Sequence, residues 1–172
     1  VWIRTPIQRL TDAMFAFPDI LLAILIMGIW QNGVLPLIIA LSSTAWPPVA
    51  RLVRTQVASL KDREYVTASK AMGASGGFQF LKHVLPHLWG ILLAIAFIDV
   101  AAIILAESSL SFLGIGIDLS TPSWGGMINH ARTVMQSHPM QLVWPCLFLS
   151  ATIFALNFVG DGLRALTDPR NR

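Results

Sequence analysis

Residues 88–113, LWGILLAIAFIDVAAIILAESSLSFL, decide the fold class of this chain. A helix needs about 20 predominantly apolar residues to cross the hydrocarbon core of a bilayer, which is about 30 Å thick. At about 1.5 Å per residue, this run makes a helix roughly 39 Å long, enough to span with some tilt. It therefore predicts a membrane-spanning helix that starts after Pro86 and ends before Gly114-Ile115-Gly116.

The rest of the chain has the same apolar character. Of its 172 residues, 55% are hydrophobic and 12% are charged, which is too apolar for an ordinary soluble domain. The sequence therefore predicts an all-α polytopic membrane bundle. Four spans are predicted, at about 13–30, 34–53, 88–113 and 140–159.

Proline and glycine punctuate these apolar blocks. Pro18 lies near the start of the first span, where a missing N–H does least harm, and Gln31-Asn32-Gly33 predicts the turn that follows. Pro47-Pro48 predicts a kink near Trp46 in the second span. Gly160-Asp161-Gly162 is expected to close the fourth span.

Lysine and arginine gather on one side of the predicted bundle. Residues 51–82 hold half of the chain's 12 Lys and Arg residues, and Arg4 and Arg9 precede the first span, whereas residues 31–33 and 114–139 hold only Arg132. Cytoplasmic loops carry an excess of Lys and Arg. Both ends and the loop at about 54–87 are therefore predicted to be cytoplasmic. The continuous basic surface that nucleic-acid binding requires is missing from the sequence.

The polar segment at residues 61–87, KDREYVTASKAMGASGGFQFLKHVLPH, stands between two of the predicted spans. A helix is expected over 59–72, with Leu60, Tyr65, Ala68 and Met72 on one stripe. Gly73 is expected to end this helix, and Gly76-Gly77 to permit a sharp change of direction before a second short helix. The alternative is a solvated connector, but such a connector would have no use for exposed apolar side chains. These side chains predict a docking surface: Tyr65, Met72, Phe78, Phe80 and Leu81.

Residues 64–74, EYVTASKAMGA, followed by His83-Val-Leu85-Pro86, resemble the cytoplasmic coupling loop of binding-protein-dependent ABC importer permeases. The branch that carries dipeptides, oligopeptides and nickel is the most similar. The family pattern is Glu-Ala-Ala, three residues, Gly, nine residues, then Ile-x-Leu-Pro. Here Thr67-Ala68-Ser69 stand at the Glu-Ala-Ala positions, and Glu64 lies one helical turn earlier. The resemblance implies an ATPase-coupling loop made by Glu64, Tyr65, Thr67, Ala68, Ser69, Ala71, Gly73, Ala74, Leu85 and Pro86.

Motifs along almost the whole chain resemble the same branch. They are Phe17-Pro18, Trp46-Pro47-x-x-Ala50-Arg51-Leu-Val-Arg54, Glu107-x-x-Leu110-Ser-Phe-Leu-Gly114-x-Gly116, Pro122-Ser-Trp124-Gly125-x-Met127, Asn157-x-x-Gly160-Asp161-Gly-Leu-Arg164 and Leu166-x-Asp168-Pro169-Arg170. The resemblance implies a type I ABC importer permease fold in a prokaryotic inner membrane. Relatives of this kind have six spans, so two N-terminal spans and an extracytoplasmic loop are expected to precede this chain.

The resemblance also implies the function and the partners. A permease of this branch imports short peptides that an external solute-binding protein delivers, and it pairs with a homologous permease and two ATP-binding subunits. The chain itself is expected to be non-catalytic and to bind no cofactor, with ATP and Mg on the partner ATPase. No phosphate-cradling glycine loop is present in the sequence. The alternative cargo is nickel or another small solute.

A few residues outside the polar segment invite a functional interpretation. Asp99 lies near the predicted bilayer midplane, where a carboxylate is costly unless it is partnered, so it is expected to contact the translocation pathway or to serve packing. It also leaves open a different class, a proton-coupled secondary transporter. Trp124, Gly125 and Arg132 are candidate contacts with the binding protein; the alternative is a re-entrant plug anchored by Trp124.

One glutamate and the four histidines are further candidates for a functional or structural role. Glu107 is expected to organise the end of its helix and the turn that follows. The four histidines fall into two pairs on opposite sides of the membrane, so no metal site is expected. The pairs are His83 with His87, and His130 with His138.

Overall fold

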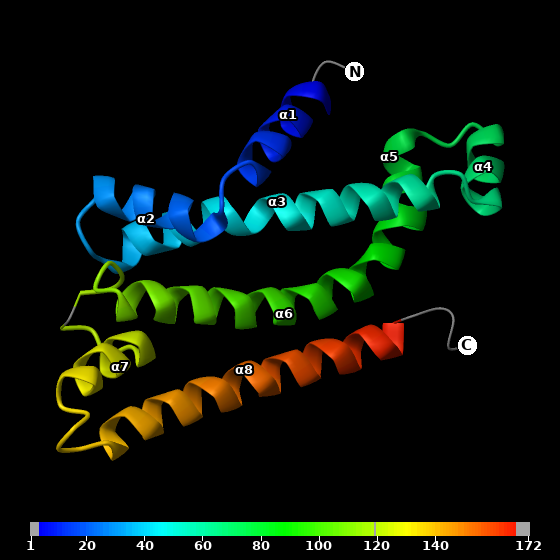
Figure 1. The fold of residues 1–172 in the computed structure, drawn as a ribbon. Coiled ribbons are helices and arrows are strands. Elements are labelled where there is room, and N and C mark those ends of the chain that lie inside the picture. The colour runs from blue at the N-terminus through cyan, green and yellow to red at the C-terminus, as the bar shows by residue number, and fades with distance from the viewer. Residues whose placement is uncertain (1–3, 119, 168–172) are drawn as a thin grey trace.

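The computed structural model describes residues 4–118 and 120–167, and within them every regular element is a helix. The predicted all-α class is therefore confirmed. In Figure 1, the long helices α3, α6 and α8 run alongside one another with α6 in the middle, and α2 folds back on α3. The elements are α1 (Arg4–Phe15), α2 (Asp19–Ile29), α3 (Val34–Leu60), α4 (Glu64–Ala71), α5 (Gly76–Gln79), the π-helical turn η1 (Phe80–Val84), α6 (Leu85–Phe112), α7 (Trp124–Thr133) and α8 (Met140–Thr167).

Three helices of the described chain are long and apolar enough to cross a membrane. They are α3, the continuous stretch Gly76–Phe112, and Met140–Leu166 within α8. Two of them outrun the predicted spans. The helix α3 continues past residue 53 to Leu60. Pro47 and Pro48, which predicted a kink near Trp46, lie inside this helix and do not interrupt it. Gly160-Asp161-Gly162, which was expected to close the fourth span, does not end the helix, since α8 continues to Thr167.

The first predicted span, 13–30, is not a single helix. Pro18 ends one helix and begins another, and Pro6–Phe15 meets Asp19–Ile29 at an angle of 96°. A proline restricts the residue before it to extended conformations, which explains why α1 stops at Phe15. The 11 residues of α2 make a helix of only about 16 Å. Residues 4–118 and 120–167 thus hold three candidate spans, or up to four if the bent pair counts as one.

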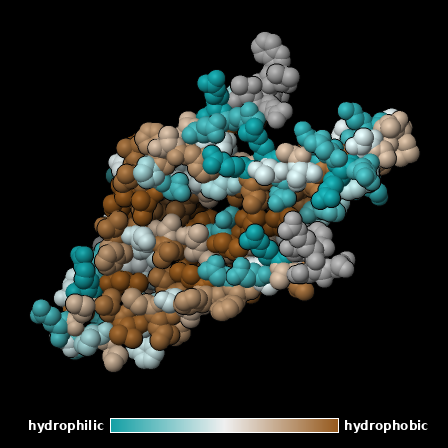
Figure 2. Space-filling view, turned by 45° about the vertical axis from the view of Figure 1, so that its right-hand side comes forward, coloured by the Kyte–Doolittle hydropathy of each residue, from teal (hydrophilic) through white to brown (hydrophobic). Residues whose placement is uncertain are grey.

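Two apolar clusters hold the bundle together near its opposite ends. In the first, Ala23 and Met27 of α2 pack on α3 and on Leu110 of α6. In the second, Leu60 at the end of α3 packs on Val84 and Leu88 at the start of the α6 rod. Large apolar side chains stay exposed elsewhere, and Figure 2 shows them as brown areas over the bundle. An apolar surface of this extent is typical of a protein that contacts lipid or further membrane helices.

Small residues let neighbouring helices approach α6 closely. Ala94, Ala101 and Ser108 recur every seventh residue along α6, and all three are buried. A side-chain Cβ at Gly160 of α8 would lie 3.1 Å from the carbonyl oxygen of Ala94 and 2.9 Å from Cγ1 of Ile98. Membrane helices commonly pack through small residues of this kind, because hydrocarbon offers no hydrophobic drive toward association.

The two ends of the bundle differ in character. One end, which we call the island end, carries most of the polar segment, at residues 61–84, together with the last turns of α8 and the contact between α1 and α3 (Figure 1). The loop end carries the connections at residues 30–33, 113–123 and 134–139. At the loop end, the Asn32 side-chain amide donates to the carbonyl of Gly114 at 3.0 Å, which ties the α2–α3 turn to the end of α6. Residues 168–172, with Asp168-Pro169-Arg170, lie outside the described residues.

Replacing Gly160 with Ala is expected to lower thermal stability, because the new methyl group must displace Ile98 or the backbone of Ala94. Overpacking of this kind costs about 1–3 kcal/mol. Gly162 is the matched control, since a Cβ there meets nothing within 4 Å. Gly162→Ala should be neutral or stabilising by up to about 1 kcal/mol through helix propensity. Thermal unfolding of the detergent-solubilised protein measures both effects, and equal shifts for the two variants would contradict the close packing.

Candidate functional site

Residues 61–84 form a helical hairpin that projects beyond the island ends of α3 and α6 (Figure 1). We call this segment the island hairpin: the link 61–63, α4, the link 72–75, α5 and η1. Figure 2 shows it as a tip that protrudes from the body of the molecule. The link after α3 is short, and the carbonyl of Arg63 begins α4 by accepting hydrogen bonds from the backbone of Val66 and Thr67, both at 3.0 Å.

Gly73 makes the bend of the hairpin. Its φ of 83° lies in the left-handed region that favours glycine. The N–H of Gly73 donates to the carbonyl of Lys70 at 3.0 Å, and the N–H of Ala74 donates to that of Ser69 at 3.1 Å. These two bonds define a Schellman motif, which ends α4 where the sequence predicts. The sequence predicted that Gly76 and Gly77 would make the bend. Instead, they are the first residues of α5.

Ser75 starts the second arm of the hairpin. Its hydroxyl accepts a hydrogen bond from the N–H of Phe78 at 3.3 Å, as an N-cap does. The side-chain amide of Gln79 reaches back to the carbonyl of Ala74 at 2.9 Å. The link between the two arms is therefore held at both ends by its own hydrogen bonds, and it gives the hairpin one defined shape.

The two faces of α4 differ in exposure. Val66 and Ser69 are buried, so Ser69 faces inward and is not part of the outer surface. Tyr65, Ala68 and Met72 lie on the exposed side, and Met72 keeps 83% of its surface exposed. Leu60 was expected on this stripe, but it belongs to α3 and packs against Val84 and Leu88. An exposed apolar stripe on a protruding hairpin is a candidate docking surface.

Polar residues of the predicted coupling loop take distinct places. Glu64 is exposed in the first turn of α4, where its charge complements the positive helix end. The Thr67 hydroxyl donates to the carbonyl of Arg63 at 3.2 Å, so it serves the helix itself. Ala71 is exposed and Ala74 half-buried. Leu85 and Pro86 lie in the first turn of α6, outside the hairpin.

The second arm of the hairpin is continuous with a membrane-spanning helix. The stretch Gly76–Phe112 forms one unbroken helix through α5, η1 and α6, and it curves between α5 and the body of α6 (Figure 1). In the π-helical turn, the N–H of Leu85 donates to the carbonyl of Phe80, five residues earlier. A π turn absorbs one extra residue without breaking the helix, just before Pro86 removes a donor.

A group of aromatic and imidazole rings joins α4 to this helix, and it was not predicted from the sequence. The ring of Tyr65 lies 5.9 Å from that of His83 and 6.3 Å from that of His87, and Phe78 lies 6.1 Å from His83. The i,i+4 spacing of His83 and His87 was the signal available, because it puts both rings on one face. Among the described residues, no group of three or more His, Cys, Asp or Glu side chains is placed to hold a metal ion.

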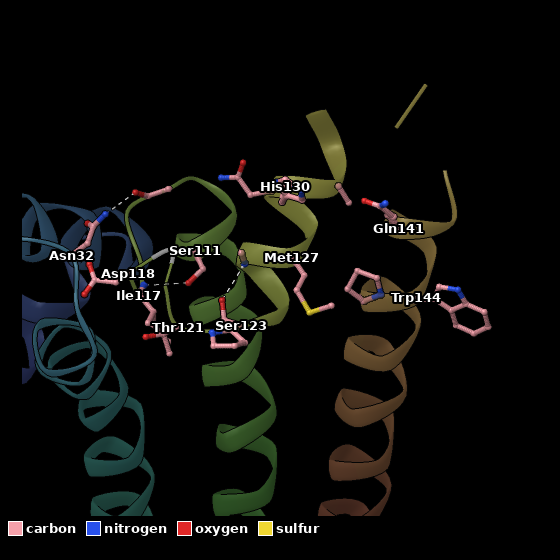
Figure 3. A pocket seen from close by; sticks show the side chains of 16 residues that line it. Asn32, Ser111, Ile117, Asp118, Thr121, Ser123, Met127, His130, Gln141 and Trp144 are labelled. Carbon is pink, nitrogen blue, oxygen red and sulfur yellow. Dashed lines mark hydrogen bonds between the residues drawn. The ribbon is translucent and has the colours of Figure 1, made fainter. Parts of the chain in front are cut away.

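The loop end holds a pocket of about 790 Å³, bounded by the end of α6, by α7 and by the start of α8 (Figure 3). Its wall combines polar side chains, such as Asn32 and Asp118, with the apolar side chains of Met127 and Trp144.

A hydrogen-bonded network shapes this end of α6. The Glu107 carboxylate accepts from the hydroxyls of Ser108 and Ser111, at 3.2 and 2.7 Å. The Ser111 hydroxyl in turn accepts from the N–H of Ile117 at 3.4 Å, so Glu107 organises the helix end as predicted.

The other predicted residues do not form one surface. Gly125 is buried, and a Cβ there would collide with the carbonyl oxygen of Ser108 and lie 2.8 Å from Ser108 Cα. Its visible role is close packing of α7 on α6. Trp124 is half-buried at the start of α7, while Arg132 is exposed with its guanidinium carbon 5.4 Å from the centre of the Phe112 ring. Asp99 is half-buried in α6, away from the hairpin.

The family of binding-protein-dependent transport system inner membrane components matches residues 1–172. The oligopeptide transport system permease protein OppC of Bacillus subtilis is 38% identical over 165 residues, covering 96% of this chain and 54% of that protein. OppC of Haemophilus influenzae is 36% identical over 165 residues, covering 96% and 53%. The glutathione transport system permease protein GsiD of Shigella flexneri is 37% identical over 169 residues, covering 98% and 56%.

The chain thus spans about half the length of the curated relatives that it matches. The matched family extends over the whole chain, from the bent helix pair through the island hairpin to α8. The resemblance seen in the coupling-loop motif is confirmed at this level. The chain belongs to the family of inner membrane components of binding-protein-dependent transport systems.

Proposed function

We propose that this chain is part of a permease subunit of an ATP-driven importer, and that short peptides are its cargo. Relatives at 36–38% identity carry oligopeptide and glutathione in their names, and glutathione is itself a short peptide. The subunit is non-catalytic and binds no cofactor. Its partners are a homologous permease, two ATP-binding subunits that hold ATP and Mg, and an external solute-binding protein.

In this proposal the island end faces the cytoplasm. Arg9, Arg54, Lys61 and Lys82 belong to elements at that end, whereas Arg132 is the one lysine or arginine in the described part of the loop end. Excess positive charge marks the cytoplasmic side of a membrane protein. The loop end then faces the binding protein, with Trp124, Arg132 and the pocket beside α7 as the candidate receiving surface.

The observation that carries the proposal is the continuity between the island hairpin and α6. The hairpin presents Tyr65, Ala68 and Met72 outward, and its second arm is one rod with the spanning helix. A partner ATPase that docks on the stripe and moves on binding ATP would tilt α5, and η1 and α6 would carry the tilt into the membrane. Alternating access follows from that movement of α6 against α3 and α8.

Replacing Ala68 with Trp is expected to uncouple transport. Ala68 is exposed, so the bulky ring leaves the fold intact but prevents close docking of the ATPase. Overpacking a tight contact costs about 1–3 kcal/mol, which corresponds to a loss of docking affinity of roughly 5-fold to 150-fold. The measurements are ATPase co-purification and peptide uptake in proteoliposomes that contain all subunits.

Ala58→Trp is the matched control for Ala68→Trp, because Ala58 is an exposed alanine of α3 outside the stripe. It should leave uptake and co-purification unchanged. Full uptake and full ATPase retention in the Ala68→Trp protein would refute the assignment of the hairpin as the coupling element.

Replacing Gly73 with Ala tests the shape of the hairpin. A left-handed backbone costs an alanine about 1–2 kcal/mol. We expect faster hydrogen exchange at the amides of Gly73 and Ala74 and a severalfold loss of uptake. Gly77→Ala is the control, because Gly77 is helical and a Cβ there meets nothing within 4 Å. Identical exchange in the two variants would contradict the role of the Schellman bend.

The cargo is tested by uptake into the same proteoliposomes. A labelled tripeptide should accumulate in an ATP-dependent manner, and unlabelled peptide should compete with it. Accumulation of Ni²⁺ without peptide uptake would favour the alternative cargo. Peptide uptake driven by a proton gradient without ATP, and lost in Asp99→Asn, would favour a secondary transporter instead.

A further inference from the structure

The corner between α1 and α3 contains a small basic pocket that the proposed function does not use. It has a volume of about 240 Å³ and is lined by Ile7, Gln8 and Asp12 of α1 and by Arg51 and Arg54 of α3. The two arginines are three residues apart and thus lie on one face of α3. Their position along the helix and their partners indicate what this pocket holds.

With the charge-free part of α3 placed in the hydrocarbon core, both arginines come at the depth of the lipid headgroups. No charged residue occurs in α3 from Val34, at the loop end, to Ala50. At about 1.5 Å per residue, Arg51 is roughly 26 Å along the helix from Val34, and Arg54 roughly 30 Å. The hydrocarbon core is about 30 Å thick. The first charges on α3 therefore fall where the hydrocarbon ends and the phosphate layer begins.

The helix α1 lies across this level. It meets α2 at 96°, and α2 packs along α3, so α1 runs close to the plane of the membrane. Ile7 and Leu10 leave more than half of their surfaces exposed on α1, next to polar residues such as Arg9. Exposed apolar and basic side chains on one short helix in the membrane plane are the features of an interfacial helix.

The charges in the pocket are not balanced. Arg51 lies 3.8 Å from the Asp12 carboxylate, and its guanidinium stacks 3.7 Å above the Phe15 ring. Arg54 has a neutral partner: the side-chain amide of Gln8 lies against its guanidinium group, and the orientation that turns the amide oxygen toward Arg54 puts this oxygen 2.7 Å from Nη2 and 3.1 Å from Nε and Nη1. Two guanidinium groups thus face one carboxylate, which leaves an excess positive charge at the membrane surface.

We propose that this pocket binds the phosphate of an anionic phospholipid. The planar guanidinium fork suits a phosphate, because it donates two parallel hydrogen bonds. The depth of the pocket and the apolar side chains of Ile7 and Phe15 beside it match a lipid, whose acyl chain continues along the bundle. The negative surface of the leaflet supplies the ligand at high local concentration. The site rests on membrane placement alone and is independent of the cargo.

The experiment is a lipid titration of the delipidated full-length protein, read by native mass spectrometry. Phosphatidylglycerol should bind the wild-type protein at least fivefold more tightly than phosphatidylcholine. Inorganic phosphate, added as a competitor, should displace phosphatidylglycerol only weakly. Equal affinity for the two lipids, or displacement by millimolar phosphate, would overturn the proposal, the latter in favour of a soluble phosphate ligand.

Three variants locate the site. Arg54→Gln should weaken phosphatidylglycerol binding about fivefold, because one basic side chain is lost. Asp12→Asn should tighten it severalfold, because Arg51 is released from its carboxylate, and a gain of binding cannot come from misfolding. Lys61→Gln removes an equal charge from an exposed residue of the island hairpin and should change nothing. Loss of binding in Lys61→Gln equal to that in Arg54→Gln, or unchanged binding in Asp12→Asn, would refute the pocket.

Discussion

The need of the backbone for hydrogen-bond partners governs this fold. Within hydrocarbon no water replaces a missing partner, so a spanning segment must bond its own N–H and C=O groups. The backbone hydrogen bonds around the break at Pro18 illustrate this requirement. The N–H groups of Ala16 and Phe17 donate to carbonyls of the preceding turn, Pro18 has no N–H, and its carbonyl accepts from Leu21 and Leu22 at 3.0 and 3.1 Å. The chain turns by 96° here while these groups stay bonded.

The same constraint makes α6 the element on which the others depend. Once the backbone bonds are internal, helices in lipid associate mainly through close packing. Small residues recur at regular spacing along α6, and glycines of the neighbouring helices pack against them. Gly160 of α8 packs against Ala94, and Gly125 of α7 packs against Ser108. The island hairpin continues from the other end of α6, so one helix carries the contacts with α7 and α8 and the second arm of the hairpin.

The sequence predicted features whose cause is local. Apolar length predicted the rough position of the three long helices but not the break at Pro18. The small-residue run after a helical pattern predicted the end of α4 at Gly73, whereas the change of direction was expected at Gly76-Gly77. The prediction from sequence failed where one residue type has two structural roles. Glycine can end a helix or allow another helix to pack closely. Gly160 has the second role because it packs against Ala94, and this contact cannot be read from the local sequence. Leu60 was placed on the stripe of α4 because helical spacing assumes one unbroken helix, whereas residues 61–63 separate the two.

The two arms of the hairpin are attached to the bundle in different ways. The arm α4 follows α3 after the short irregular link 61–63, while α5 continues through η1 into α6 without a break. Leu60, Val84 and Leu88 pack together where the two arms meet the bundle. In the proposed coupling, a load on α4 would bend the link to α3 and pass through the rings of Tyr65, His83 and His87 and the bend at Gly73. The apolar cluster would then act as the pivot about which α6 moves relative to α3.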